Sequence, residues 1–194
     1  RQKDAGFLRV IGRRRRRRGA LCIVIAAGDA GACDAIEIGA DVGVGRRLMR
    51  LDPAELSDGQ PLVGGGGRFL LVADLRLDNR QELAEALGLR ARDLAVTADA
   101  RLALGAFERW GEDCSQFLCG DYALAVWDQD RQHWFLARDA MGGRPLHYFH
   151  GPHLFAFASM PRGLHALPEI PYAVDEDLLA RAFTLAPAGS DASC

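Results

Sequence analysis

The chain has 194 residues, with 24 Lys+Arg, 26 Asp+Glu and a formal net charge of −2. With 49% hydrophobic and 26% charged residues, it has the composition of a globular domain, which excludes collagen, coiled coil and global disorder. No apolar run approaches the roughly 18 residues that a membrane helix needs, and the charge gives no reason to expect nucleic acid as a partner. We therefore expect one cytoplasmic domain without a membrane contact, with room for the beginning of a second domain.

The first 45 residues are predicted to be an irregular N-terminal segment. Short strands are expected within 4–11 and 20–27, whereas 28–45 shows no clear period. The arginine run at 13–18 lacks interleaved aromatic residues, so a solvated run is favoured over a nucleic-acid or acidic-membrane site. Two interpretations stay open. Residues 13–45 are a genuine but poorly packed segment that limited proteolysis would cut first near the arginine run, or they are a frame-shifted translation that the nucleotide sequence would reveal.

From residue 46 onward the pattern becomes regular, and residues 46–170 are predicted to form the main domain, followed by a linker-like segment at 171–194. Helices are expected at 78–87, 100–110 and 175–183, and Thr97 or Asp99 is expected to cap the second of them. The expected strands are 68–77, 121–128, 133–138, 145–149 and 154–158. Short strands of period two with helices between them indicate an α+β fold with antiparallel sheets.

The cysteines and histidines show no metal-binding pattern. Five cysteines at irregular spacing indicate reduced thiols, with Cys119 expected to be buried beside a strand. All five histidines follow residue 132 and are expected on the surface of hairpins, without the spacing of metal ligands. The neighbours Arg138 and Asp139 are expected to form an internal ion pair, and Arg144 and Pro145 are expected to form a turn.

Seven short blocks follow one another in a fixed order between residues 45 and 159. They are Gly45-Arg-Arg-Leu, Gln60-Pro-Leu, Leu77-Asp-Asn-Arg-Gln-Glu-Leu, Phe107-Glu-Arg-Trp-Gly-Glu-Asp-Cys, Gly120-Asp-Tyr-Ala-Leu-Ala-Val-Trp-Asp, Leu136-Ala-Arg-Asp-Ala-Met-Gly-Gly-Arg-Pro-Leu-His-Tyr and Phe157-Ala-Ser. In this order they resemble the glutaminase domain of glutamine-dependent asparagine synthetases, a class II glutamine amidotransferase. The last block, together with Met160-Pro-Arg-Gly-Leu-His-Ala-Leu-Pro, looks most like the asparagine-synthetase-like cyclases of lasso-peptide clusters.

The resemblance implies a fold and a reaction. The fold is a four-layer α+β sandwich of two antiparallel sheets between helices, as in N-terminal nucleophile hydrolases. In the reaction, an N-terminal cysteine attacks the side-chain amide of glutamine, its own α-amino group acts as the base, and an Asn-Gly pair stabilises the oxyanion. The ammonia then passes to a synthetase domain, in cis or in trans, which uses ATP and Mg²⁺. The pyrophosphate loop of that domain is absent from this sequence, so we expect no cofactor in this chain.

The resemblance also assigns substrate-binding positions, and two of them depart from the family pattern. Arg47 falls where an arginine binds the substrate carboxylate, and Asp99 falls where an aspartate binds its α-ammonium group. If the amino-acid pocket is retained, these two side chains are expected to face one cavity. Asp74 and Leu75 fall on the Asn-Gly pair. An ionised Asp74 would repel the developing oxyanion, and Leu75 lacks the backbone freedom of glycine.

The nucleophile is the largest departure. Gln2 stands at the position of the N-terminal cysteine, and a carboxamide is not a nucleophile. Cys22 is the only nearby thiol, and its use would require cleavage after Leu21. The main hypothesis is therefore a glutaminase-like domain of an asparagine synthetase-like amide ligase, degenerate at its own site, with glutamine as a candidate ligand. The alternative is a non-catalytic scaffold domain of a lasso-peptide cyclase-like protein.

Overall fold

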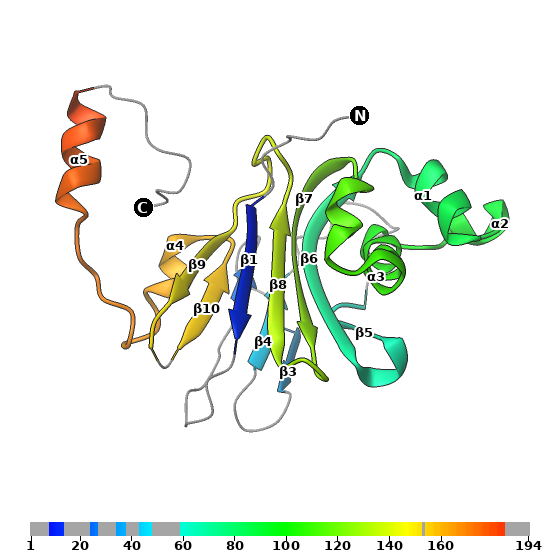
Figure 1. Cartoon of the computed structure of the whole chain (residues 1–194), viewed down its shortest axis with the longest axis horizontal. Coiled ribbons are helices and arrows are strands. Elements are labelled where there is room, and N and C mark those ends of the chain that lie inside the picture. Colours follow the sequence, from blue (N-terminus) through cyan, green and yellow to red (C-terminus); the bar gives the residue numbers. More distant parts are fainter. Residues whose placement is uncertain are drawn as a thin grey trace.

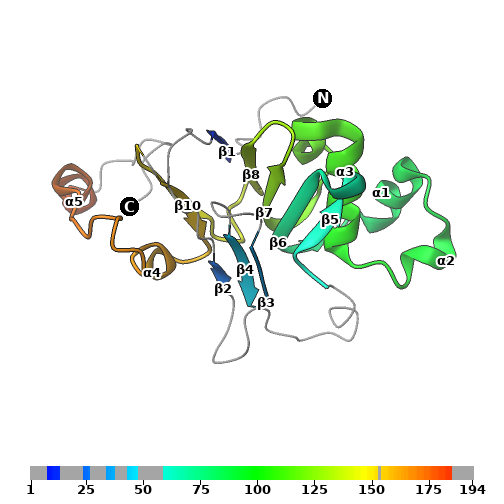
Figure 2. The same ribbon diagram turned by 90° about the horizontal axis from the view of Figure 1, so that it is seen from below.

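The computed structural model describes residues 8–13, 24–26, 34–37, 43–47, 59–152 and 154–184. Two five-stranded sheets lie face to face, and helices cover the outer face of the first (Figures 1 and 2). The first sheet contains, in spatial order, β1 (Leu8–Arg13), β8 (His133–Arg138), β7 (Gly120–Asp128), β6 (Phe69–Leu77) and β5 (Leu62–Gly64). All neighbouring strands of this sheet are antiparallel.

The second sheet is mixed. In spatial order it contains β3 (Asp34–Glu37), β4 (Gly43–Arg47), β2 (Val24–Ala26), β10 (Phe155–Ala158) and β9 (His147–His150). The strand β2 runs parallel to both of its neighbours, and the outer pairs are antiparallel. The predicted α+β architecture of two stacked sheets is confirmed, with two parallel pairings that the prediction did not include. The stretch 28–45, for which no period was visible, supplies β3 and the beginning of β4.

Five α-helices complete the described elements: α1 (Arg80–Leu87), α2 (Ala91–Leu94), α3 (Asp99–Trp110), α4 (Pro161–Leu164) and α5 (Glu176–Phe183). Short 3₁₀ segments lie at Gly65–Gly67 and Gly111–Gln116. The helix α1 ends at Gly88, whose positive φ of 75° lets its N–H reach the carbonyls of Ala84 and Glu85. The predicted cap of α3 is wrong, because the N-cap residue is Ala98 and no side chain caps the helix.

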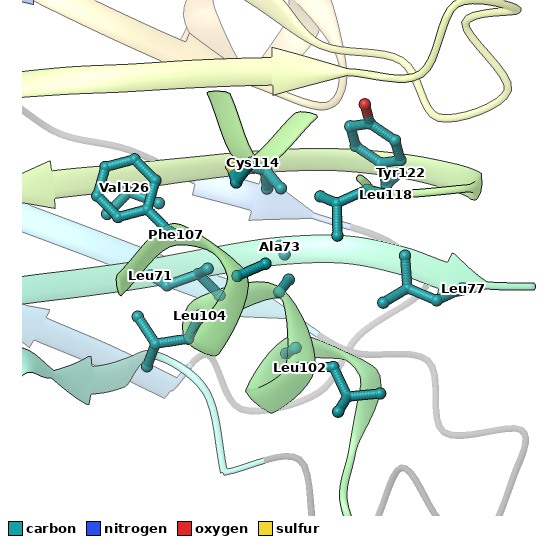
Figure 3. Packing of buried hydrophobic residues seen from close by; sticks show 14 of the residues in the cluster. Leu71, Ala73, Leu77, Leu102, Leu104, Phe107, Cys114, Leu118, Tyr122 and Val126 are labelled. Carbon is teal, nitrogen blue, oxygen red and sulfur yellow. The ribbon is translucent and has the colours of Figure 1, made fainter. Parts of the chain in front are cut away.

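The core is organised by the alternation of residues along the central strands. On β6, Leu71 and Ala73 face the helices and pack with Leu102 and Phe107 of α3 (Figure 3). The intervening residues of β6 face the second sheet, in a cluster whose members include Leu70, Val72, Trp127, Trp134, Phe155 and Phe157. A third cluster joins α4 to the outer face of β10 through Leu164 and Ala156. The three apolar layers between four structural layers match the sandwich implied by the resemblance.

Three expectations about polar side chains and thiols are wrong. Cys119 is exposed, and it is Cys114 that is buried in the helix-side cluster. His133 is buried and lies 3.4 Å from the carboxylate of Glu112 instead of on the surface. Asp139 accepts hydrogen bonds from backbone N–H groups, and in the described part of the chain it forms no ion pair with Arg138. Within the same residues, no helix is both long and apolar enough to cross a bilayer.

Candidate functional site

The pairing register of the strands places Asp74 near one end of the first sheet. Leu8 of β1 lies opposite Arg138, Arg138 lies opposite Ala123, and Ala123 lies opposite Asp74. These four residues form a row across four strands. The last residues of β6, the first of β7 and the last of β8 therefore meet at this end, where β1 also begins.

The outer edge of β6 is covered by side chains where β5 stops. The buried Gln60 accepts a hydrogen bond from the N–H of Ala73 at 2.6 Å, and Asp99 accepts one from the N–H of Leu77 at 2.7 Å. Because backbone groups alternate along a strand, the N–H of Leu75 points to the same edge. It makes no hydrogen bond to the described residues, and its side chain packs against the helix-side cluster. One backbone donor is thus left at the position that the resemblance assigns to glycine.

Asp74, at the position assigned to an asparagine, is paired with a cation. Its Oδ1 lies 3.4 Å from Nη1 of Arg144, with 18% of the Asp74 side chain and 36% of the Arg144 side chain exposed. Nε of Arg144 is buried and has no hydrogen-bond partner among the described residues. A carboxylate only accepts hydrogen bonds, so Asp74 supplies no donor here. The pair is a single, partly exposed contact.

The loop that carries Arg144 is held by Asp139. This buried carboxylate accepts hydrogen bonds from the N–H groups of Gly143 at 3.0 Å, Tyr122 at 3.2 Å and Arg144 at 3.3 Å. Burial acts to raise the pKa of Asp139, but the backbone hydrogen bonds outweigh it and hold the pKa below its usual range. An ionised Asp139 therefore fixes the loop to the start of β7 and sets the position of Arg144.

Asp99 is joined to the protein through both of its oxygens. Oδ2 accepts the N–H of Leu77, and Oδ1 forms an ion pair with Nη1 of Arg80 at the start of α1. Only 16% of the Asp99 side chain is exposed. The carboxylate predicted to bind a substrate ammonium group thus already has a cation of this chain beside it.

The remaining predicted site residues are not brought to this end by anything that the structure describes. Arg47 is the last residue of β4, opposite Ala26 of β2, and the placement of its side chain lies outside the described part. Gln2 and Cys22 also lie outside the described residues. The prediction that Arg47 and Asp99 face one cavity therefore stays a prediction.

The arrangement limits the chemistry of this end of the sheet. An oxyanion site needs hydrogen-bond donors aimed at the developing negative charge. Of the two positions assigned to that task, Leu75 retains a backbone N–H and Asp74 presents a carboxylate. No group of three or more His, Cys, Asp or Glu side chains within the described residues is arranged to hold a metal ion.

Two arginines at this end were not identified from the sequence as site residues. Arg144 was expected only to form a turn with Pro145. Arg80 carried a signal that was overlooked: a cation in the first turn of a helix is disfavoured by the helix dipole, so it indicates a nearby anion. For Arg144 the sequence holds no such signal, because its partner lies on a strand 70 residues earlier.

Comparisons with known proteins agree with this architecture. A profile described as "Glutamine amidotransferase domain" matches residues 33–194. "Asparagine synthetase [glutamine-hydrolyzing] 3" of Bacillus subtilis (strain 168) is 33% identical over 122 residues, which cover 63% of this chain and 20% of the relative. "Asparagine synthetase [glutamine-hydrolyzing] 2" of the same organism is 28% identical over 132 residues, covering 68% of this chain and 17% of the relative.

The chain spans about a fifth of the length of these relatives. The similarity covers most of the sandwich, since the profile runs from β3 through α5. The matched range includes four strands of each sheet and all five described α-helices. The chain belongs to the glutamine amidotransferase domain family, and it is similar in sequence to asparagine synthetases of the glutamine-hydrolyzing type.

Proposed function

We propose that this domain serves an ATP-dependent amide ligase of the asparagine synthetase type, and that its own glutamine site does not hydrolyse glutamine. The names of the relatives support the ligase, which would contact this domain as a synthetase domain in cis or in trans. ATP and Mg²⁺ would bind to that synthetase domain and not to this chain. A cytoplasmic location is part of the same proposal.

The observation that carries the loss of hydrolysis is the Asp74–Arg144 pair. Where the reaction needs a donor to an oxyanion, the chain places a carboxylate at 3.4 Å from a guanidinium. Removing one oxyanion donor typically lowers the rate by about 10²–10³, or about 2.7–4 kcal/mol of barrier. Gln2 at the nucleophile position removes covalent catalysis in addition. Both losses act on the same step, so restoring only one of the two groups is not expected to restore hydrolysis.

Ammonia release from L-glutamine tests the proposal. The unaltered chain is expected to release no ammonia above the buffer background. A chain that begins at position 2 with Gln2→Cys is expected to remain inactive as well, because Asp74 and Leu75 are unchanged. The triple variant Gln2→Cys, Asp74→Asn and Leu75→Gly supplies the smallest set of groups that the chemistry requires. Turnover by the unaltered chain would overturn the proposal and make Cys22 the first residue to mutate.

The second candidate function is a scaffold domain that packs against a ligase domain or a peptide partner, as in a lasso-peptide cyclase-like protein. It is favoured by the way both acidic residues of the expected pocket are paired with arginines of the chain itself. Neither candidate is expected to release ammonia from glutamine. Saturable binding of glutamine would exclude the scaffold, whereas the proposed ligase domain is compatible with a glutamine site that is either retained or closed.

A further inference from the structure

Asp99 is enclosed by the protein on both of its oxygens. Oδ2 lies 2.7 Å from the backbone nitrogen of Leu77, at the end of β6. Oδ1 is buried and has no hydrogen-bond partner among the described residues, but it forms an ion pair with Nη1 of Arg80. A free ligand would therefore have to replace a contact of the protein in order to reach either oxygen.

Arg80 is held in place by more than its ion pair. Its Nη2 donates to the carbonyl of Thr97 at 2.7 Å and to that of Leu94 at 3.1 Å. These two carbonyls lie at the end of α2 and just before α3, and Arg80 itself is the first residue of α1. The planar guanidinium thus joins three helices and Asp99 at once, in the fixed fork geometry that arginine provides.

The location of Arg80 indicates that the pair is a specific feature. The first turn of a helix has positive potential from its free N–H groups, which disfavours a cation there. Asp99 compensates for this charge at short range. A second cation beside the pair, such as the ammonium group of an amino acid, would meet Arg80 as a like charge.

We propose that Arg80 is an internal counter-ion that occupies the cation position of Asp99, so that this carboxylate joins β6 to the helical layer and is closed to a ligand ammonium group. The inference rests on the proposed function, because it is the family resemblance that assigns Asp99 to such a group. Arg80 is here a positioning residue that excludes the α-ammonium group of free amino acids such as L-glutamine.

A double-mutant cycle on unfolding tests the pair. The variants are Arg80→Gln, Asp99→Asn and the double variant; the carboxamide introduced by Asp99→Asn keeps a carbonyl for the N–H of Leu77. We expect the unfolding equilibrium constants to show a coupling of at least about fivefold, equivalent to about 1 kcal/mol. Additive effects of the two single variants would overturn the inference.

The neighbouring pair Arg76–Asp78 is the matched control. Its atoms lie 3.1 Å apart, but the two side chains are 73% and 57% exposed. The cycle of Arg76→Gln with Asp78→Asn removes the same charges from the same strand end. We expect a coupling below about twofold, as for solvent-exposed pairs. A control coupling as large as that of Arg80 with Asp99 would show that the latter is an ordinary surface pair.

A titration of the unaltered protein with L-glutamine, followed by the NMR signals of the backbone amides of Leu75 and Leu77, tests the exclusion. We expect no saturable shift of either amide, because Asp99 is not available. A saturable shift at Leu77 would overturn the inference. If it occurred without ammonia release, the inference about Arg80 would fail while the proposed loss of hydrolysis stood; ammonia release would instead overturn the proposed function.

A second measurement covers the case in which Arg80→Gln does not fold. In the Asp99→Asn variant alone, the guanidinium protons of Arg80 lose their anionic partner. We expect their exchange with solvent to become at least about tenfold faster than in the unaltered protein. Unchanged exchange would show that Asp99 does not hold Arg80, and would overturn the inference.

Discussion

The two ends of the β6–β7 ladder use carboxylates in different ways. At the hairpin end, formed by Arg68 and residues 128–132, Asp128 is 3% exposed and accepts from Nε and Nη2 of Arg68 at 3.0 and 2.8 Å. It also accepts the N–H groups of Asp130 and Arg131. At the site end, formed by residues 74–77, Asp99 and the loop 139–144, Asp74 has a single contact of 3.4 Å with Arg144.

The difference lies in where the partners come from. At the hairpin end, Asp128 is hydrogen-bonded by residues of its own turn and by Arg68. Arg68 lies close because the next residue, Phe69, is opposite Asp128 in the strand pairing. The site end depends on residues that are distant in the sequence, and Nε of Arg144 has no hydrogen-bond partner among the described residues. Because a polar atom there is left without a hydrogen bond, the site end gains less stability from its carboxylate than the hairpin end does.

The largest effect is expected at Asp139, which holds the loop of the site end, and not at the Asp74–Arg144 pair. Asp139→Ala removes the acceptor of three backbone N–H groups, and we expect it to lower the free energy of unfolding by about 3 kcal/mol. Urea unfolding at pH 7 measures this loss. The exposed Asp121, beside the same loop, is the control, and Asp121→Ala should change stability by less than about 0.5 kcal/mol. Equal losses in the two variants would contradict the role given to Asp139.

A backbone change at the beginning of β7 tests how tightly the strand ends meet. Gly120 has φ of 138°, and a Cβ there would lie 2.2 Å from the carbonyl oxygen of Arg76. We expect Gly120→Ala to lower stability by about 2 kcal/mol, because both the conformation and the space exclude a side chain. Gly59→Ala, where nothing lies within 4 Å, should stay within about 0.5 kcal/mol of the unaltered protein in the same thermal or urea experiment. Tolerance of alanine at position 120 would mean that the strand end is not fixed as described.

At the hairpin end, Asp128→Asn is expected to lower stability by about 1.5 kcal/mol at pH 7. Burial opposes the charge of Asp128, but the hydrogen bonds from Arg68 and from two backbone N–H groups hold its pKa below the usual value. Its contribution is therefore complete above the unfolded-state pKa of about 3.9 and is lost as the pH falls through the lower pKa of the folded state. Urea unfolding at pH 7 and near pH 3 should show the difference between the two proteins shrinking in acid. The same difference in stability at both pH values would argue against a stabilising role for the charge of Asp128.

The smallest expected effect is at the Asp74 pair itself. Arg144→Gln removes one partly exposed contact, and we expect a loss of less than about 1 kcal/mol. The measurement is urea unfolding at pH 7, with Asp128→Asn measured in parallel. A larger loss of stability in Arg144→Gln than in Asp128→Asn would reverse the comparison between the two ends.

Strong periodicity made much of the fold predictable. The strands β6, β7 and β8 and the helix α3 lie within one or two residues of their predicted bounds, because alternating or helical apolar patterns continue through each. The four-residue helices α2 and α4 and the strand β3 are too short to show a period.

The site was less predictable than the fold, for a physical reason. The position of Asp74 near the end of a strand followed from the sequence, but its contact with Arg144 depends on a loop that Asp139 places from 65 residues away. The contact of Asp99 with Leu77 likewise joins a helix to a strand across 22 residues. A helix cap is a local interaction and was the natural expectation for Asp99, whereas the actual bonds require the finished tertiary structure.

The place of β1 in the first sheet has a consequence for the order of assembly during synthesis. This strand lies at the edge, and its neighbour among the described strands is β8, with Leu8 opposite Arg138. At a synthesis rate of about 5–20 residues per second, the ribosome needs on the order of 10 s to reach the partner strand. Closing so long a loop is slow, and we expect it to follow the formation of the local β7–β8 hairpin. The strand β1, which is synthesised before the other described strands, is thus among the last of them to be paired, and a nascent chain stalled before residue 133 has no β8 to pair with it.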